Sequence, residues 1–73
     1  MTLQINGEKR QFPDALTVSA LVEHLGMKDD RVAIELNLDI LPRERWSSTE
    51  LHDGDRLEIV HFVGGGAATE TRN

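Results

Sequence analysis

Apolar and polar residues alternate at the start of the chain, which predicts a β-hairpin there. Leu3 and Ile5 alternate with polar neighbours, as in a half-buried strand. The pair Asn6-Gly7 follows, and it is typical of a two-residue hairpin turn because both residues tolerate positive φ. The return strand should stop before Pro13, which has no N–H group for a strand ladder. We therefore expect a hairpin over residues 2–12.

The pattern then changes to helical spacing. Thr17 can cap the first turn of a helix, and Gly26 can end the helix in a left-handed conformation. A helix over residues 18–25 would be short enough to need packing against the rest of the protein. Its apolar face consists of four residues spaced i, i+3, i+4 and i+7: Val18, Leu21, Val22 and Leu25.

Strand patterns return in the second half of the chain. We expect a strand over 32–36, a short extended piece at Ile40-Leu41, an irregular segment over 43–51 with room for one 3₁₀ turn, and a last strand over 56–63. The apolar residues of the last strand are too continuous for clean alternation, which favours a central position in the sheet, beside the first strand. The order ββαβ(β)β predicts an α+β fold in which one helix covers one face of a mixed sheet of four to five strands.

Length and composition limit what this chain can be. Its 73 residues suit one domain, and we place this domain at residues 1–63, followed by a flexible tail over 64–73. The net charge of −5, with no run of basic residues, argues against a nucleic-acid partner. No stretch approaches the ~20 apolar residues of a membrane span, and the N-terminus lacks the pattern of a signal peptide. Together with the absence of cysteine, this predicts a cytoplasmic protein. We also expect the protein to be monomeric when free.

Catalytic and metal-binding motifs are weak in this sequence. His24, His52 and His61 share no short motif, so we expect no metal site. The Asp53–Asp55 stretch reads as a tight turn, because it lacks the further ligands of a calcium loop. Gly64–Gly66 lacks the lysine and hydroxyl residue of a phosphate-binding loop. We therefore expect a protein without catalytic side chains of its own and without a bound cofactor.

Four local patterns resemble one known family. They are the opening strand with Asn-Gly, the helix segment TVSALVEHL (17–25), the segment VAIELNLDILPRERW (32–46), and the segment LHDGDRLEIVHFVGGG (51–66). In these features the chain resembles the bacterial sulfur carrier proteins of thiamine biosynthesis, the ThiS family, which have the ubiquitin-like β-grasp fold. The similarity covers residues 1–66. Members of the family typically end at a Gly-Gly pair, whereas this chain continues from Gly66 through residues 67–73.

The resemblance implies a function as a protein cosubstrate rather than an enzyme. An adenylating partner of the ubiquitin-activating type would use ATP and Mg²⁺ to activate the carboxylate of Gly66. Sulfur from a cysteine desulfurase system would convert it to a thiocarboxylate, which thiazole synthase would consume. Because the chain continues past Gly66, we expect that residues 67–73 are removed first.

The residues themselves fit a carrier of this kind. Gly64 and Gly65 would form a leash that accepts almost any backbone conformation and lets a partner's backbone approach closely. Four residues from Val63 to Gly66 reach at most about 14 Å. Gly66 would carry the sulfur at the end of this leash.

Three apolar residues are candidates for docking on a partner. Trp46 is either a packing residue that covers the sheet edge or a partner-binding anchor. Phe62 and Val63 immediately precede the leash, and the alternation of the last strand makes either His61 or Phe62 face outward. The sequence leaves core and interface roles for Phe62 equally open.

Two other functions remain open at this point. The chain could be a non-catalytic β-grasp interaction module whose glycines are a linker, because fold does not fix function. It could also be a sulfur carrier for molybdopterin or cysteine synthesis.

Overall fold

The structure is a computed structural model that describes residues 1–63 and 69–72 of the chain. Its elements follow the order expected from the sequence, with one further 3₁₀ helix, η1, and one further strand added, and η2 lies in the segment where room for one 3₁₀ turn was expected. In chain order they are β1 (Thr2–Ile5), β2 (Glu8–Gln11), α1 (Val18–His24), η1 (Asp29–Arg31), β3 (Val32–Leu36), β4 (Asp39–Ile40), η2 (Arg43–Ser48), β5 (Arg56–Val63) and β6 (Thr69–Arg72).

The predicted hairpin is confirmed. β1 and β2 pair antiparallel, with Ile5 opposite Glu8 across the two-residue turn. Asn6 and Gly7 adopt φ values of 51° and 86°, the left-handed region that such a turn requires. Leu3 and Ile5 point into the core, whereas all four residues of β2 are exposed. β2 is therefore an edge strand that contributes pairing rather than buried surface.

The predicted helix is confirmed to within one residue at its C-terminal end. Thr17 caps α1 through its hydroxyl oxygen, which accepts a hydrogen bond from the Ala20 N–H at 3.1 Å. Gly26 follows with φ 73°, the left-handed conformation expected after a helix end. Val18, Leu21 and Val22 are buried against the sheet. This packing stabilises a helix that is too short to persist alone.

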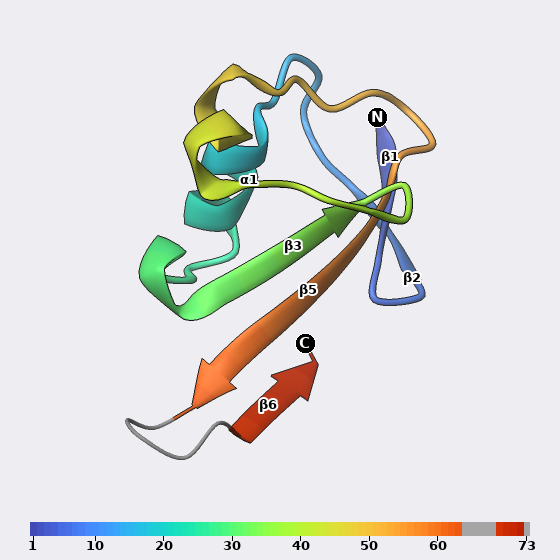
Figure 1. Cartoon of the computed structure of the whole chain (residues 1–73). Coiled ribbons are helices and arrows are strands. Elements are labelled where there is room, and N and C mark those ends of the chain that lie inside the picture. The colour runs from blue at the N-terminus through green and yellow to red at the C-terminus, as the bar shows by residue number, and fades with distance from the viewer. Residues whose placement is uncertain (64–68, 73) are drawn as a thin grey trace.

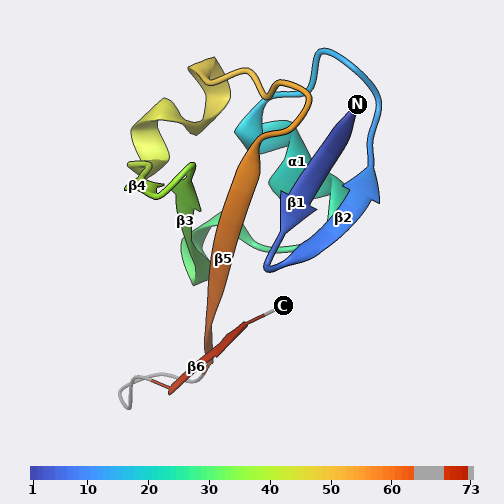
Figure 2. The same ribbon diagram turned by 90° about the vertical axis from the view of Figure 1, so that its right-hand side faces the viewer.

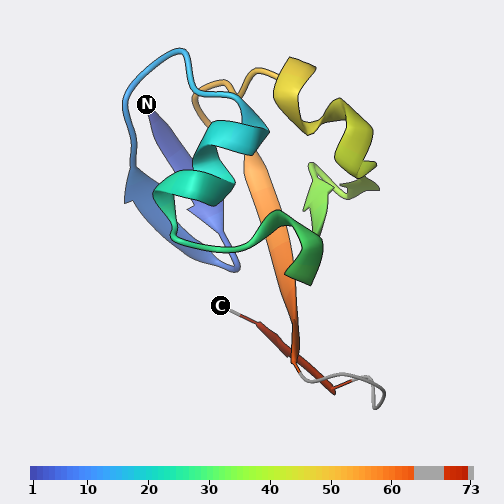
Figure 3. The same ribbon diagram turned by 90° about the vertical axis from the view of Figure 1, so that its left-hand side faces the viewer.

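The sheet is mixed, with β5 at its centre. The strand order is β2-β1-β5-β3-β4, and β1 pairs with β5 in parallel while the other pairs in this series are antiparallel. The prediction that the last long strand lies beside the first is thus confirmed. α1 packs on one face of the sheet, as Figure 1 and the two side views in Figures 2 and 3 show. The core between the two layers contains Leu3, Ile5, Val32, Ile34, Leu57 and Ile59 from the sheet.

Asn6 joins the first and central strands beyond the hairpin turn. Its side-chain nitrogen donates to the carbonyl of Ile59 at 3.1 Å, and its side-chain oxygen accepts from the Ile59 N–H at 2.8 Å. Its own backbone N–H donates to the carbonyl of Leu57. The side chain therefore extends the β1–β5 ladder past the end of β1, at a position where Ile59 is fully buried.

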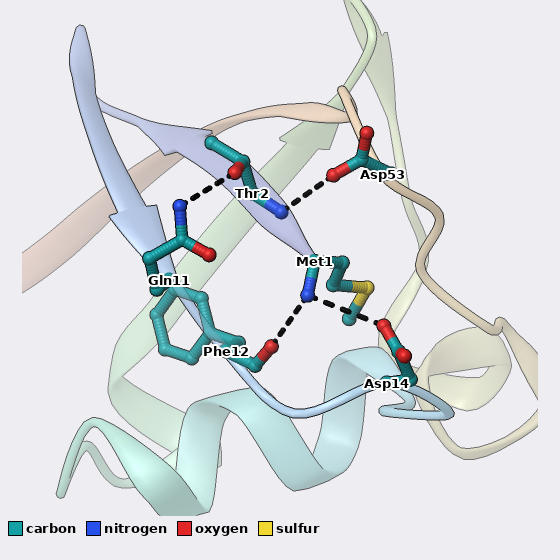
Figure 4. Close-up of polar contacts among 6 residues, drawn as sticks. All are labelled: Met1, Thr2, Gln11, Phe12, Asp14 and Asp53. Carbon is teal, nitrogen blue, oxygen red and sulfur yellow. Dashed lines mark hydrogen bonds and ion pairs between the residues drawn. The ribbon is translucent and has the colours of Figure 1, made fainter.

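Contacts with Asp53 of the Asp-Gly-Asp turn and with Phe12 and Asp14 fix the start of the chain, as Figure 4 shows. The Asp53 carboxylate accepts from the Thr2 N–H at 2.6 Å. The ammonium group of Met1 donates to the carbonyl of Phe12 at 2.8 Å and lies 3.2 Å from a carboxylate oxygen of Asp14. Gly54 takes φ 89° and donates its N–H to the Thr2 carbonyl. The motif is a tight turn, as predicted from the sequence.

The structure corrects one expectation for the tail. Residues 69–72 form β6, which pairs antiparallel with β5, so this part of the expected flexible tail belongs to the sheet. The physical reason is that the end of β5 extends past β1 and offers unpaired backbone groups to a further strand. Threonine, at positions 69 and 71, is a residue type that favours strands. Residues 64–68 and 73, including the three candidate glycines, lie outside the described residues.

Candidate functional site

The candidate site centres on the end of β5, where the described chain reaches Val63. This strand is paired with β3 over Leu57–His61 and with β1 at Arg56 and Leu57. A residue that follows β5 is therefore attached directly to the best-anchored strand of the sheet. Gly64, Gly65 and Gly66 are the next three residues in sequence, and the side chain of Val63 also lies outside the described part.

Opposite the helix, the sheet has a face that no other element of the described chain covers with a second layer (Figure 2). Side chains alternate along a strand, so the residues between the core positions of β3 and β5 lie on this open face. On β5 these are Arg56, Glu58, Val60 and Phe62, and on β3 they are Ala33 and Glu35. The polar members lie near the start of β5 and the apolar members near its end.

Phe62 and Ile40 line one shallow groove at the apolar end of the open face. Ile40 is 78% exposed and Phe62 is 38% exposed, an unusual exposure for such large apolar side chains. Ala33, Leu41 and Pro42 also line the groove, and the charged Arg43 and Glu44 lie at it as well. An apolar centre with charged groups beside it is the composition of a protein-binding surface. The structure thus places Phe62 outside the core, beside the chain that leads to the glycines.

Leu38 is the most exposed of the large apolar residues in the described chain, at 81%. It also has φ 76°, in the left-handed region that β-carbon-bearing residues avoid. Together with Gln4, Glu35 and Arg56 it lines a small hollow on the sheet. A residue that is both strained and unfavourably exposed is typical of a functional position.

We expect Leu38→Gly to raise the free energy of unfolding by about 0.5–1 kcal/mol, because glycine adopts this φ without strain and no burial is lost. Urea unfolding followed by Trp46 fluorescence measures this change. Asp39→Gly, one residue away and without positive φ, should instead destabilise the protein. A Leu38→Gly protein no more stable than the original would show that the strain is absent in solution.

Trp46 requires a correction to the docking hypothesis. Its side chain is only 3% exposed, and its indole Nε1 donates to the carbonyl of Leu41 at 3.0 Å. The guanidinium carbon of Arg43 lies 5.4 Å from the centre of the indole ring. Trp46 is therefore a packing residue that joins η2 to the core, and its buried surface does not serve as an anchor for a partner.

Sequence reasoning missed Leu38 and Ile40 as surface residues. It treated the first as part of a turn and the second as part of a short extended piece. The available signal was the pattern Leu-Asp-Ile after Asn37, which places two large apolar residues around a turn that needs only polar ones.

The described residues provide no metal site and no membrane-crossing helix. Within the described chain, no group of three or more histidine, aspartate or glutamate side chains is arranged to hold a metal ion. In the same part of the molecule, no helix has the length and apolar character needed to cross a membrane. Among the described residues, the site thus consists of the apolar surface at the end of β5.

Comparisons with known proteins show the family to which this chain belongs. The model of the ThiS family matches residues 3–66. The chain is 40% identical over 65 residues to the sulfur carrier protein ThiS of Bacillus subtilis, a match that covers 88% of this chain and 98% of that protein. It is also similar in structure to the thiamine biosynthesis protein ThiS of Geobacter metallireducens, with a TM-score of 0.78 and 35% identity over 90% of this chain and 100% of the other.

A third relative is much longer than this chain. The chain is 48% identical over 67 residues to a protein of Paramagnetospirillum magneticum named thiazole synthase. That match covers 92% of this chain and 21% of the relative, so the chain spans about a fifth of the relative's length.

Proposed function

Because this chain belongs to the ThiS family and is a ThiS-type sulfur carrier of thiamine biosynthesis with a β-grasp fold, we propose that the carboxylate of Gly66 is the group that carries the sulfur. The observation that carries this proposal is the residue at which the match to the ThiS family model ends. It falls at residue 66, three residues after β5 ends at Val63. Gly66 is thus the position where a member of the family would present its terminal carboxylate.

The proposed chemistry takes place on the backbone and needs no side chain of the carrier. Hydrolysis of the peptide bond after Gly66 first releases residues 67–73 and leaves a free carboxylate. In the active site of an adenylating enzyme, a carboxylate oxygen attacks the α-phosphorus of ATP, held with Mg²⁺, and pyrophosphate leaves. The product is an acyl adenylate, in which AMP is a good leaving group.

Sulfur then replaces the activating group. The terminal sulfur of a persulfide, supplied by a cysteine desulfurase system, attacks the acyl carbon, and AMP leaves. A second thiol cleaves the sulfur–sulfur bond of the resulting acyl disulfide, which releases the thiocarboxylate on Gly66. Each step requires that the last residues of the carrier enter a narrow active site, which favours glycine because it has no side chain.

The described residues contribute the surface on which a partner enzyme docks. We assign this role to the apolar groove at Phe62 and Ile40, because it lies at the end of β5 from which the glycines follow. A partner bound there would receive Gly66 within the reach of the leash. The rigid sheet fixes the direction in which the leash starts, which lowers the entropy cost of inserting it.

Thiazole synthase is the proposed acceptor of the sulfur. Two relatives named thiazole synthase contain a segment similar to this chain within a longer protein, over 21% and 20% of their lengths. The presence of a carrier-like segment in the same protein as thiazole synthase supports a direct transfer of sulfur from the carrier to thiazole synthase. We place the reaction in the cytoplasm, where ATP and the desulfurase system are available.

The proposal is tested by reconstitution with a chain that ends at Gly66. Mixed with the adenylating enzyme of its host, ATP, Mg²⁺ and sulfide, this chain should gain the mass difference between one sulfur and one oxygen atom. The full chain, incubated in the same mixture, should keep its mass. A non-catalytic interaction module would keep its mass in both forms.

A further inference from the structure

The backbone of β5 presents one unpaired edge near its end. In a strand, the N–H and C=O groups of successive residues point to alternate sides. Ile59 directs both groups toward Asn6, and Leu57 directs its carbonyl there too, on the side of β1. By alternation, His61 and Val63 direct their backbone groups to the same side, beyond the end of β1.

β6 occupies this edge. It pairs antiparallel with β5, with Thr71 opposite His61 and Thr69 opposite Val63. It must lie on the β1 side, because β3 occupies the other edge of β5 up to His61. Figures 1 and 2 show it alongside the end of β5. His61–Thr71 and Val63–Thr69 are therefore the hydrogen-bonded pairs of the ladder, and the N–H of Glu70 points away from β5.

This pairing brings Val63 and Thr69 together, and these two residues flank the segment that contains Gly66 in the sequence. Val63 and Thr69 are opposite each other, so their Cα atoms lie about 5.5 Å apart, the spacing of a hydrogen-bonded antiparallel pair. Gly66 is three residues from each of them in sequence. While β6 remains paired, a partner meets two adjacent strands, β5 and β6, at this end of the sheet, and a channel that fits one extended chain excludes the pair.

We propose that β6 is an autoinhibitory strand, which docks on the backbone edge of β5 at His61 and Val63 and holds the carrier in a closed precursor form. The inhibitory role rests on the proposed function of Gly66. Release of β6 must come before the bond after Gly66 is cut, because a protease binds its substrate as an extended single chain. Removal of residues 67–73 then makes the release of β6 permanent and leaves the backbone edge of β5 at His61 and Val63 free.

Amide hydrogen exchange tests the pairing itself. In the full chain, the amides of His61 and Val63 should exchange at least about tenfold more slowly than in a chain that ends at Gly66. The amide of Val60, which points toward Ala33 of β3, should exchange equally in both and serves as the internal control. Equal exchange of His61 and Val63 in the two chains would overturn the proposal.

Two proline variants separate the pairing from other effects of a substitution in β6. Thr71→Pro removes the N–H that donates to His61 and should open the strand, whereas Glu70→Pro removes an outward N–H, which an edge strand tolerates. Cleavage by subtilisin between residues 63 and 69, followed by mass spectrometry, should be about tenfold faster for Thr71→Pro than for Glu70→Pro or the unchanged chain. Equal rates in all three proteins would contradict an autoinhibitory role.

The outcomes also distinguish this proposal from the function on which it rests. If exchange and cleavage follow these expectations but a chain that ends at Gly66 gains no sulfur, the strand pairing stands and the sulfur-carrier role of Gly66 fails. If the shortened chain is charged but exchange at His61 and Val63 does not change, the carrier role stands and the autoinhibitory strand is refuted.

Discussion

In the chain that ends at Gly66, Phe62→Asp should slow sulfur charging by about 100-fold at limiting carrier concentration while the fold remains intact. An aromatic side chain at the centre of an interface contributes roughly 2–4 kcal/mol, and a carboxylate in its place must also be desolvated. Phe62 is 38% exposed and does not belong to the buried core, so its replacement leaves the core residues in place. The rate of thiocarboxylate formation, followed by intact-mass spectrometry, measures the effect.

Three further variants make this result specific. Ile40→Asp, across the same groove, should reduce the charging rate in the same direction. Phe62→Leu should retain most of the activity, because it keeps an apolar surface. Ser47→Asp adds the same charge at an exposed position of η2 and should charge at the original rate. If Ser47→Asp is as slow as Phe62→Asp, net charge rather than the groove controls docking.

Asn6→Ala should lower the free energy of unfolding by about 3 kcal/mol, a large part of the ~4–11 kcal/mol expected for a domain of this size. The substitution removes both side-chain hydrogen bonds to the backbone of Ile59 and leaves those two groups unpaired in the core. It also places a β-carbon-bearing residue that favours helix at φ 51°. Urea unfolding at constant pH measures the loss.

The two causes can be separated at the same position. Asn6→Gly accepts the positive φ but still lacks the side-chain bonds, so it should be more stable than Asn6→Ala by about 1 kcal/mol and remain less stable than the original. The Ile59 amide should exchange faster in both variants. A stability within 0.5 kcal/mol of the original for Asn6→Ala would show that the Asn6–Ile59 contact is not a significant link between β1 and β5.

Most of the fold could be predicted from local patterns in the sequence. The Asn-Gly turn, the capped apolar helix and the largely apolar last strand each have one dominant physical cause, and the structure has all three in the expected places. The resemblance of four segments to one family then gave the β-grasp arrangement, which the similarity to a solved ThiS structure confirms. Boundaries shifted by a residue at the ends of β2 and α1 and in the short β4.

The open face and β6 were harder to predict because they depend on long-range pairing. The local pattern Leu-Asp-Ile marks Ile40 as unusual, but the face on which Ile40 lies follows from its long-range context, because its pairing with Glu35 puts it on the face without a helix. The burial of Trp46 depends on how η2 packs on α1. Thr69 and Thr71 have a strand preference, but a four-residue segment pairs only where an unpaired edge is available, and that edge arises because β1 ends before His61.

The most direct test of this account is the intact mass of the charged carrier. The reconstituted reaction should yield a species that ends at Gly66 and in which one oxygen has been replaced by sulfur, and fragmentation should place the sulfur on Gly66. The full chain in the same reaction should remain unmodified. A sulfur-charged species that still carries residues 67–73, or a chain ended at Gly66 that stays uncharged in the presence of active adenylating enzyme, ATP and sulfide, would contradict it.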